Sequence, residues 1–125
     1  MSFTVSQDVF KLAEVFTISR GSRTEAKVLT VKVERDGVTG WGECVPYARY
    51  GETLESVSEQ VAGLPEGVSR AALYDLLDAG AARNAVDCAL WDLEAKTAGK
   101  RVWDLASVVA PKPCITAFTL SLDTP

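Results

Sequence analysis

The chain has 125 residues, 13 basic and 17 acidic side chains, a net charge of −4 and no histidine. This length suits one domain, and an apolar fraction of 47% with a charged fraction of 24% is typical of a globular protein. The absence of histidine excludes Ser-His-Asp and Cys-His nucleophilic sites within the chain, and zinc sites that need imidazole. The acidic balance argues against a nucleic-acid partner, because proteins that bind nucleic acids usually carry a basic surface.

A membrane-spanning segment, a signal peptide and disulfide-forming cysteines are the sequence patterns that indicate the cellular compartment. No apolar run approaches the roughly 20 residues that cross a bilayer, and the first residues lack the basic-then-apolar layout of a signal peptide. Three widely spaced cysteines, Cys44, Cys88 and Cys114, favour reduced thiols over a disulfide framework or a zinc knuckle. We therefore expect a cytoplasmic protein with no membrane partner.

The first part of the chain predicts β-structure. A strand is expected within residues 3–12, followed by a loop over residues 18–24 that contains Gly, Ser and two arginines. Leu29, Val31 and Val33 alternate with polar residues, which indicates a half-buried second strand.

A third strand is expected over residues 38–44. The preceding Asp36-Gly37 supplies the positive φ angles of a type I′ turn, so the two strands form a hairpin. Two glycines in this strand, Gly40 and Gly42, predict either a close backbone approach or a bulge. The three strands together predict an antiparallel sheet. A second loop is expected over residues 45–52, directly after the third strand.

Helices are expected from Thr53 onward. Thr53 is the predicted N-cap of a helix that ends near Gly63, with Ser56 in place of Glu, so that the capping box is incomplete. Ser69 is expected to cap a second helix that continues to about Leu77.

The third predicted helix has the clearest periodicity. Its buried face is expected to comprise Ala82, Ala85, Val86, Ala89 and Leu93. On the other side, Arg83–Asp87 and Asp92–Lys96 are expected to form i,i+4 ion pairs, and Gly99 is expected to end the helix. Asp87 and Asp92 lie about 140° apart around the axis, which favours a solvated face over a metal site.

The two loops are the candidates for chemistry, because no P-loop or GxGxxG motif occurs. Arg20 and Arg23 suit carboxylate recognition, and Tyr47, Arg49 and Tyr50 combine aromatic rings with polar tips. Two interpretations remain open from the residues alone. The loops form a lip over a cleft for an anionic small molecule, or they are ordinary surface loops.

The motifs resemble a known family. Residues 16–23 (FTISRGSR), 42–47 (GECVPY) and 49–52 (RYGE) resemble the N-terminal capping domain of the enolase superfamily, in its muconate-lactonising subgroup. Residues 82–93 resemble the cap helix of that subgroup, and the RGSR and PYxRYGE loops resemble the L-Ala-D/L-Glu type of dipeptide epimerase.

The resemblance implies an α+β fold, in which the three-stranded antiparallel sheet is followed by a helical bundle. It places a capping domain at residues 1–113 and the first strand of a (β/α) barrel at residues 114–125. The last residues, 123–125 (DTP), have the pattern of a helix start, so we expect the barrel to be truncated there.

The resemblance also implies an isomerase that needs Mg²⁺. In the family, two lysines remove and return an α-proton, and a Mg²⁺ held by three carboxylates stabilises the enediolate. Those residues are expected beyond Pro125. No catalytic or metal-ligating residue is therefore assigned within the chain, which is predicted to be inactive alone.

The cap implies substrate-binding residues. Arg23 matches the family position expected to meet a substrate carboxylate, with Ile18, Arg20 and Tyr50 as further candidates, whereas Glu43 and Asp87 are expected to be structural. The implied partners are a dipeptide substrate and the chain's own barrel domain, and homo-oligomers are an additional possibility. The alternatives are the cap of an N-succinylamino acid racemase, o-succinylbenzoate synthase or muconate cycloisomerase, or a non-catalytic binding module.

Overall fold

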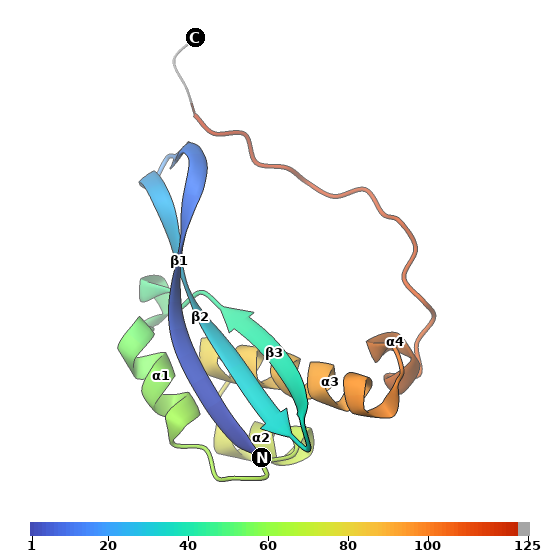
Figure 1. The fold of residues 1–125 in the computed structure, drawn as a ribbon. Coiled ribbons are helices and arrows are strands. Elements are labelled where there is room, and N and C mark those ends of the chain that lie inside the picture. Colours follow the sequence, from blue (N-terminus) through green and yellow to red (C-terminus); the bar gives the residue numbers. More distant parts are fainter. Residues whose placement is uncertain (123–125) are drawn as a thin grey trace.

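The computed structural model describes residues 1–122 and contains one antiparallel sheet with strand order β1-β2-β3. The strands are β1 (Ser2–Ile18), β2 (Gly21–Arg35) and β3 (Val38–Cys44). The helical elements are η1 (Ala48–Tyr50), α1 (Leu54–Ala62), α2 (Arg70–Leu76), α3 (Ala81–Ala98) and α4 (Val102–Leu105). Helix α3 packs on β3 and β2, and α1 contacts β1, as Figure 1 shows. The predicted α+β fold is confirmed.

The core lies between the sheet and α3. Every second residue of the inner part of β2 is fully buried, namely Leu29, Val31 and Val33. The five residues predicted for the buried face of α3 are buried as well, and Leu90 joins them. Because an apolar strand face and an apolar helix stripe bury each other, the two periodicities are sufficient to orient these elements.

Two glycines bring α3 directly onto the sheet. A Cβ atom at Gly40 would overlap the carbonyl oxygen of Ala89, and one at Gly42 would overlap that of Ala85. The register between β2 and β3 is continuous from Leu29↔Cys44 to Arg35↔Val38. Of the two predictions for these glycines, the close approach is therefore confirmed and the bulge is wrong.

Both hairpin turns are tight, but one prediction about them is wrong. Asp36 and Gly37 have φ angles of 51° and 78°, as a type I′ turn requires. The predicted loop over residues 18–24, in contrast, is mostly strand, because only residues 19–20 turn while β1 and β2 continue on either side. The outer parts of β1 and β2 pair as a two-stranded ribbon beyond a register shift between Lys11 and Phe16, and this ribbon projects from the sheet in Figure 1.

The predicted helix boundaries are confirmed, with one correction. Thr53 Oγ1 accepts a hydrogen bond from Ser56 N at 3.0 Å, and Ser56 Oγ accepts one from Thr53 N at 3.0 Å. The capping box is thus complete, because the serine hydroxyl replaces the usual glutamate. Ser69 caps α2, and Gly99 ends α3 in the left-handed conformation with φ 61°.

One of the two predicted ion pairs of α3 is present. Lys96 Nζ lies 2.6 Å from Asp92 Oδ2. Arg83 instead lies over the Tyr74 ring, 5.0 Å from its centroid, and donates to Leu77 O at 3.4 Å. The guanidinium therefore points toward α2, and the predicted Arg83–Asp87 pair is wrong.

The segment after α4 has neither helix nor strand in the described residues. A strand is stable only where its backbone groups find a neighbouring strand, and the predicted strand over residues 114–122 has no paired neighbour within residues 1–122. Ser121 and Leu122 contact the ribbon, where Leu122 N donates to Thr17 O at 2.8 Å and Ser121 Oγ accepts from Thr17 N at 2.9 Å. The boundary between residues 113 and 114 stays a prediction, and the predicted helix start at residues 123–125 lies outside the described residues.

Two further findings concern the described chain as a whole. No helix within residues 1–122 is both long and apolar enough to cross a membrane. The three cysteines are free thiols, as expected, with Cys44 buried and the other two exposed.

Candidate functional site

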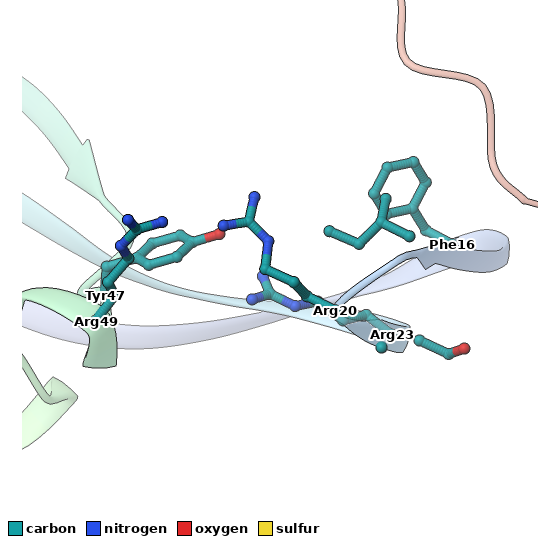
Figure 2. Close-up of a pocket in the computed structure, with 8 residues that line it drawn as sticks. Phe16, Arg20, Arg23, Tyr47 and Arg49 are labelled. Carbon is teal, nitrogen blue, oxygen red and sulfur yellow. The ribbon is translucent and has the colours of Figure 1, made fainter.

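The tip of the β1–β2 ribbon and the loop after β3 enclose a hollow of about 250 Å³. We call it the arginine hollow. It is lined by Phe16, Ile18, Arg20, Gly21, Ser22, Arg23, Tyr47 and Arg49. The two-residue turn at the ribbon tip places Arg20 and Arg23 on the side that faces the loop. Figure 2 shows both arginine side chains extending toward Tyr47 and Arg49.

The charged residues that line the arginine hollow are all positive. Arg20, Arg23 and Arg49 are exposed, and no acidic residue lines the hollow. The salt bridges found within residues 1–122 involve other side chains. Planar guanidinium groups with free N–H donors bind carboxylates through paired hydrogen bonds, so the hollow is suited to an anionic ligand.

Tyr47 connects the ribbon to the loop. The Arg23 guanidinium lies 5.8 Å from the centroid of the Tyr47 ring, within the range of a cation–π interaction. The Tyr47 ring also lies 6.2 Å from that of Tyr50. The backbone N of Tyr47 donates to Glu52 Oε2 at 3.0 Å, so that a carboxylate holds the loop.

The structure brings together three of the four predicted site residues. Arg23, Ile18 and Arg20 line the arginine hollow, but Tyr50 does not. Tyr50 is 76% exposed and borders a second, wider hollow of about 550 Å³, together with Tyr47 and Glu52. Phe16 also lines the arginine hollow, although it was not among the predicted site residues. It pairs with Arg23 across the two strands of the ribbon.

Asp92 and Glu94 of α3 make structural contacts and do not converge on one site. Asp92 Oδ2 accepts hydrogen bonds from Trp41 N at 2.9 Å and from Lys96 Nζ, which ties α3 to β3. Glu94 pairs with Arg70 at 2.8 Å. In the described part of the chain, no group of three His, Cys, Asp or Glu side chains is placed to hold a metal ion. The described residues therefore do not fit a Mg²⁺ site.

Burial keeps the thiol at the edge of the second hollow protonated. Burial raises the pKa of Cys44 from 9.0 to about 11, and the nearby Glu52 and Glu43 carboxylates add to the effect. Burial also raises the pKa of Cys88, with a further contribution from Asp87. Because the thiolate is the nucleophilic form, neither thiol is arranged as a nucleophile.

The chain matches a known family over most of its length. Residues 1–106 match the model of the mandelate racemase / muconate lactonizing enzyme N-terminal domain. The chain belongs to this family. Its match to the N-terminal domain confirms the predicted membership of the enolase superfamily as a capping domain.

Two curated members of the family illustrate the similarity. The chain is 45% identical over 125 residues to an L-Ala-D/L-Glu epimerase from Escherichia coli, covering 97% of this chain and 39% of that protein. It is 42% identical over 92 residues to an N-acetyl-D-glutamate racemase from Pseudoalteromonas, covering 69% of this chain and 29% of that protein. The chain thus spans about two fifths or less of the length of these relatives.

Solved structures of family members show the same fold. An enolase family member from Agrobacterium tumefaciens with homology to dipeptide epimerases, solved with sodium and L-Ala-L-Glu, superimposes with a TM-score of 0.90 at 45% identity, covering 97% of this chain and 38% of that one. A dipeptide epimerase from Enterococcus faecalis, solved with Mg and L-Leu-L-Tyr, gives a TM-score of 0.68 at 27% identity, covering 83% of this chain and 33% of that one.

Proposed function

We propose that the chain is the substrate-specificity cap of a Mg²⁺-dependent dipeptide epimerase of the L-Ala-D/L-Glu type. The observation that carries the proposal is the arginine hollow, which is lined by three arginines and by no acidic residue. The relatives support it, since one is an L-Ala-D/L-Glu epimerase and another was solved with L-Ala-L-Glu.

In this proposal the cap binds and orients the substrate. Arg23 and Arg20 bind the side-chain carboxylate of the dipeptide, while Ile18 and Phe16 provide an apolar wall that excludes water. Tyr50 contacts the substrate from the edge of the loop. A fixed cation beside a carboxylate is more effective where water is excluded, because the local dielectric constant is lower.

The proposal assigns the reaction itself to another domain. Proton abstraction and return, through an enediolate, would occur on a barrel domain that packs against the cap. The metal ligands would lie there too. Magnesium was present in the structures of the Enterococcus faecalis, Methylococcus capsulatus and Cytophaga hutchinsonii dipeptide epimerases. We also propose a cytoplasmic location, as the sequence predicts.

The test is α-proton exchange by the full-length enzyme. With the full-length enzyme, we expect deuterium from the solvent to enter the α-position of the Glu residue in L-Ala-L-Glu, which NMR would detect. We expect the isolated chain to catalyse no exchange. Arg23→Ala should raise KM for L-Ala-L-Glu roughly 10- to 100-fold, because a hydrogen bond between charged groups contributes about 1.5–3 kcal/mol. Arg35→Ala, at the far exposed end of β2, is the matched control and should behave as the wild type.

A second candidate is racemisation of an N-acylated glutamate. The 42% identity to an N-acetyl-D-glutamate racemase favours it, and such a substrate carries the same side-chain carboxylate as L-Ala-L-Glu. Exchange with N-acetylglutamate at a kcat/KM above that of the dipeptide would select this candidate. Exchange with neither compound would contradict both enzymatic proposals and favour a non-catalytic binding module.

A further inference from the structure

The carboxylate of Glu52 joins the loop of the arginine hollow to the start of α3. We propose that Glu52 is a positioning residue for anionic substrates, which acts by holding Tyr47 and, through the Tyr47 ring, Arg23. This inference rests on the proposed function and extends it to a residue that does not line the arginine hollow.

Each oxygen of Glu52 accepts one backbone hydrogen bond. Oε2 accepts from Tyr47 N at 3.0 Å, and Oε1 accepts from Ala81 N at 2.6 Å, across 29 residues of sequence. Glu52 is partly buried, so water competes less for these two bonds. One side chain therefore links two segments that are 29 residues apart in the sequence.

The start of α3 is shaped to receive this carboxylate. The first N–H groups of a helix have no intrahelical acceptor, and the helix dipole favours a negative charge beside them. The N-cap of α3 is Gly80, which supplies no side-chain cap. A Cβ atom there would lie 2.9 Å from Glu52 Oε1, so the glycine leaves room for the carboxylate that caps the helix in its place.

The loop transmits this anchor to the arginine hollow. The Tyr47 carbonyl accepts from Tyr50 N at 2.8 Å and from Glu52 N at 3.3 Å, which closes residues 47–52 into a tight turn. Tyr47 is thus held at both its N–H and its C=O, and its ring faces the Arg23 guanidinium. The same turn carries Arg49 into the hollow. Loss of the anchor should displace Arg23 and Arg49 without altering the residues themselves.

Glu52→Gln removes one acceptor while it preserves the size of the side chain. Its NH₂ group cannot accept a hydrogen bond, so either Tyr47 N or Ala81 N loses its partner. We expect KM of the full-length enzyme for L-Ala-L-Glu to rise roughly tenfold, with kcat changed less than threefold. We expect kcat/KM for L-Ala-L-Gln to stay unchanged, because the neutral amide makes no ion pair with Arg23.

A double variant separates positioning from a general structural effect. If Glu52 acts through Arg23, adding Glu52→Gln to the Arg23→Ala variant should not lower kcat/KM for L-Ala-L-Glu any further. Ala81→Pro provides a second route to the same end, since proline is tolerated at the first helical position but lacks the N–H that Glu52 binds. Glu59→Gln, on the exposed face of α1, is the matched control. Two results would overturn the proposal. One is an equal loss of kcat/KM with L-Ala-L-Glu and L-Ala-L-Gln in Glu52→Gln, and the other is additive losses of kcat/KM in the double variant.

A readout independent of catalysis keeps this inference separate from the proposed function. Trypsin should cleave after Arg49 several-fold faster in Glu52→Gln than in the wild type or Glu59→Gln, because the turn is no longer anchored. An inactive full-length enzyme with this faster cleavage would refute the epimerase function but support the anchor. Unchanged cleavage would refute the anchor whatever the activity.

Discussion

At the scale of single residues, Gly42 illustrates how an absent side chain determines the packing of two elements. Helix α3 lies so close to β3 that a Cβ atom at this position would overlap the Ala85 carbonyl oxygen. The obstacle is backbone, which cannot rotate away as a flexible side chain would. The separation of helix and sheet, and with it the place of the α3 N-terminus beside Glu52, therefore depends on this glycine.

We predict that Gly42→Ala lowers the free energy of unfolding by about 1–3 kcal/mol, as overpacking typically does. Urea denaturation followed by circular dichroism would measure the change. Gly63→Ala is the control, because a Cβ there meets nothing closer than Glu59 O at 3.4 Å and the residue has a negative φ. Identical midpoints for the Gly42 variant and the wild type would contradict the packing argument.

The cysteines should differ sharply in reactivity. With a pKa of about 11, roughly a thousandth of the buried Cys44 thiol is ionised at pH 8, whereas Cys114 is exposed. We expect iodoacetamide at pH 8 to modify Cys114 first and Cys44 last, as peptide mass spectrometry would reveal. Labelling of Cys44 at the rate of Cys114 would contradict this order.

The raised pKa of Cys44 also makes the free energy of unfolding depend on pH. Between pH 9 and pH 11 the unfolded thiol loses its proton while the folded one keeps it, so the free energy of unfolding falls over this range. The fall should be smaller in Cys44→Ala, measured by urea midpoints at each pH.

At the scale of elements, Arg70 of α2 makes two contacts with α3. The Arg70 guanidinium lies 3.4 Å from the centroid of the Trp91 ring and donates from Nε and Nη2 to Glu94 Oε2, at 3.0 and 2.8 Å. A lysine can reproduce the charge but not the planar stacking.

We therefore predict that Arg70→Ala lowers the free energy of unfolding by about 1 kcal/mol. Arg70→Lys should recover only part of this loss. Thermal unfolding followed by circular dichroism would compare the three proteins. Full recovery by lysine would show that charge alone matters at this contact.

The elements differ in how far the sequence could predict them. The inner part of β2 and the buried face of α3 were predictable, since one side of each is buried and hydrophobic spacing reveals it. The outer ribbon was not, because no residue of it is fully buried and no burial pattern distinguishes it from a loop. Its Ser, Gly and Arg residues are typical of loops, although Thr17 pairs with Ser22 and Ile18 with Gly21.

The candidate site was predictable to a similar extent. The resemblance of the RGSR motif to a known family indicated Arg23, with Arg20 and Ile18 as further candidates. The role of Glu52 could not be predicted, because its partner Ala81 is 29 residues away and local patterns do not report such contacts. For the same reason, the Arg83–Asp87 pair was expected from spacing on one helix, but Tyr74 of α2 draws Arg83 away.

At the scale of the whole molecule, apolar side chains remain exposed outside the packed sheet and helices. Val9, Phe10 and Val15 of β1 are each more than half exposed, and Phe118 and Leu120 of the C-terminal segment are exposed further. Exposed apolar patches of this kind promote association.

We predict that the isolated chain forms dimers or larger oligomers, which sedimentation velocity over a range of concentrations would detect. Phe10→Ser should shift the distribution toward monomer, whereas Thr4→Ser, at an exposed position of the same strand, should not. A chain that stays monomeric at the highest concentration would contradict the prediction.

The contact of Ser121 and Leu122 with the ribbon has a consequence for the order of folding. Thr17 and Ser121 are 104 residues apart, whereas the partners within the ribbon tip are separated by a few residues. The entropy lost on closing a loop grows with its length, so local pairings form before distant ones. In pulse-labelled hydrogen exchange, the Leu122 amide should gain protection after the amides of the β1–β2 hairpin. The wall of the arginine hollow that the ribbon supplies thus forms early, and the C-terminal segment attaches to a ribbon that has already formed.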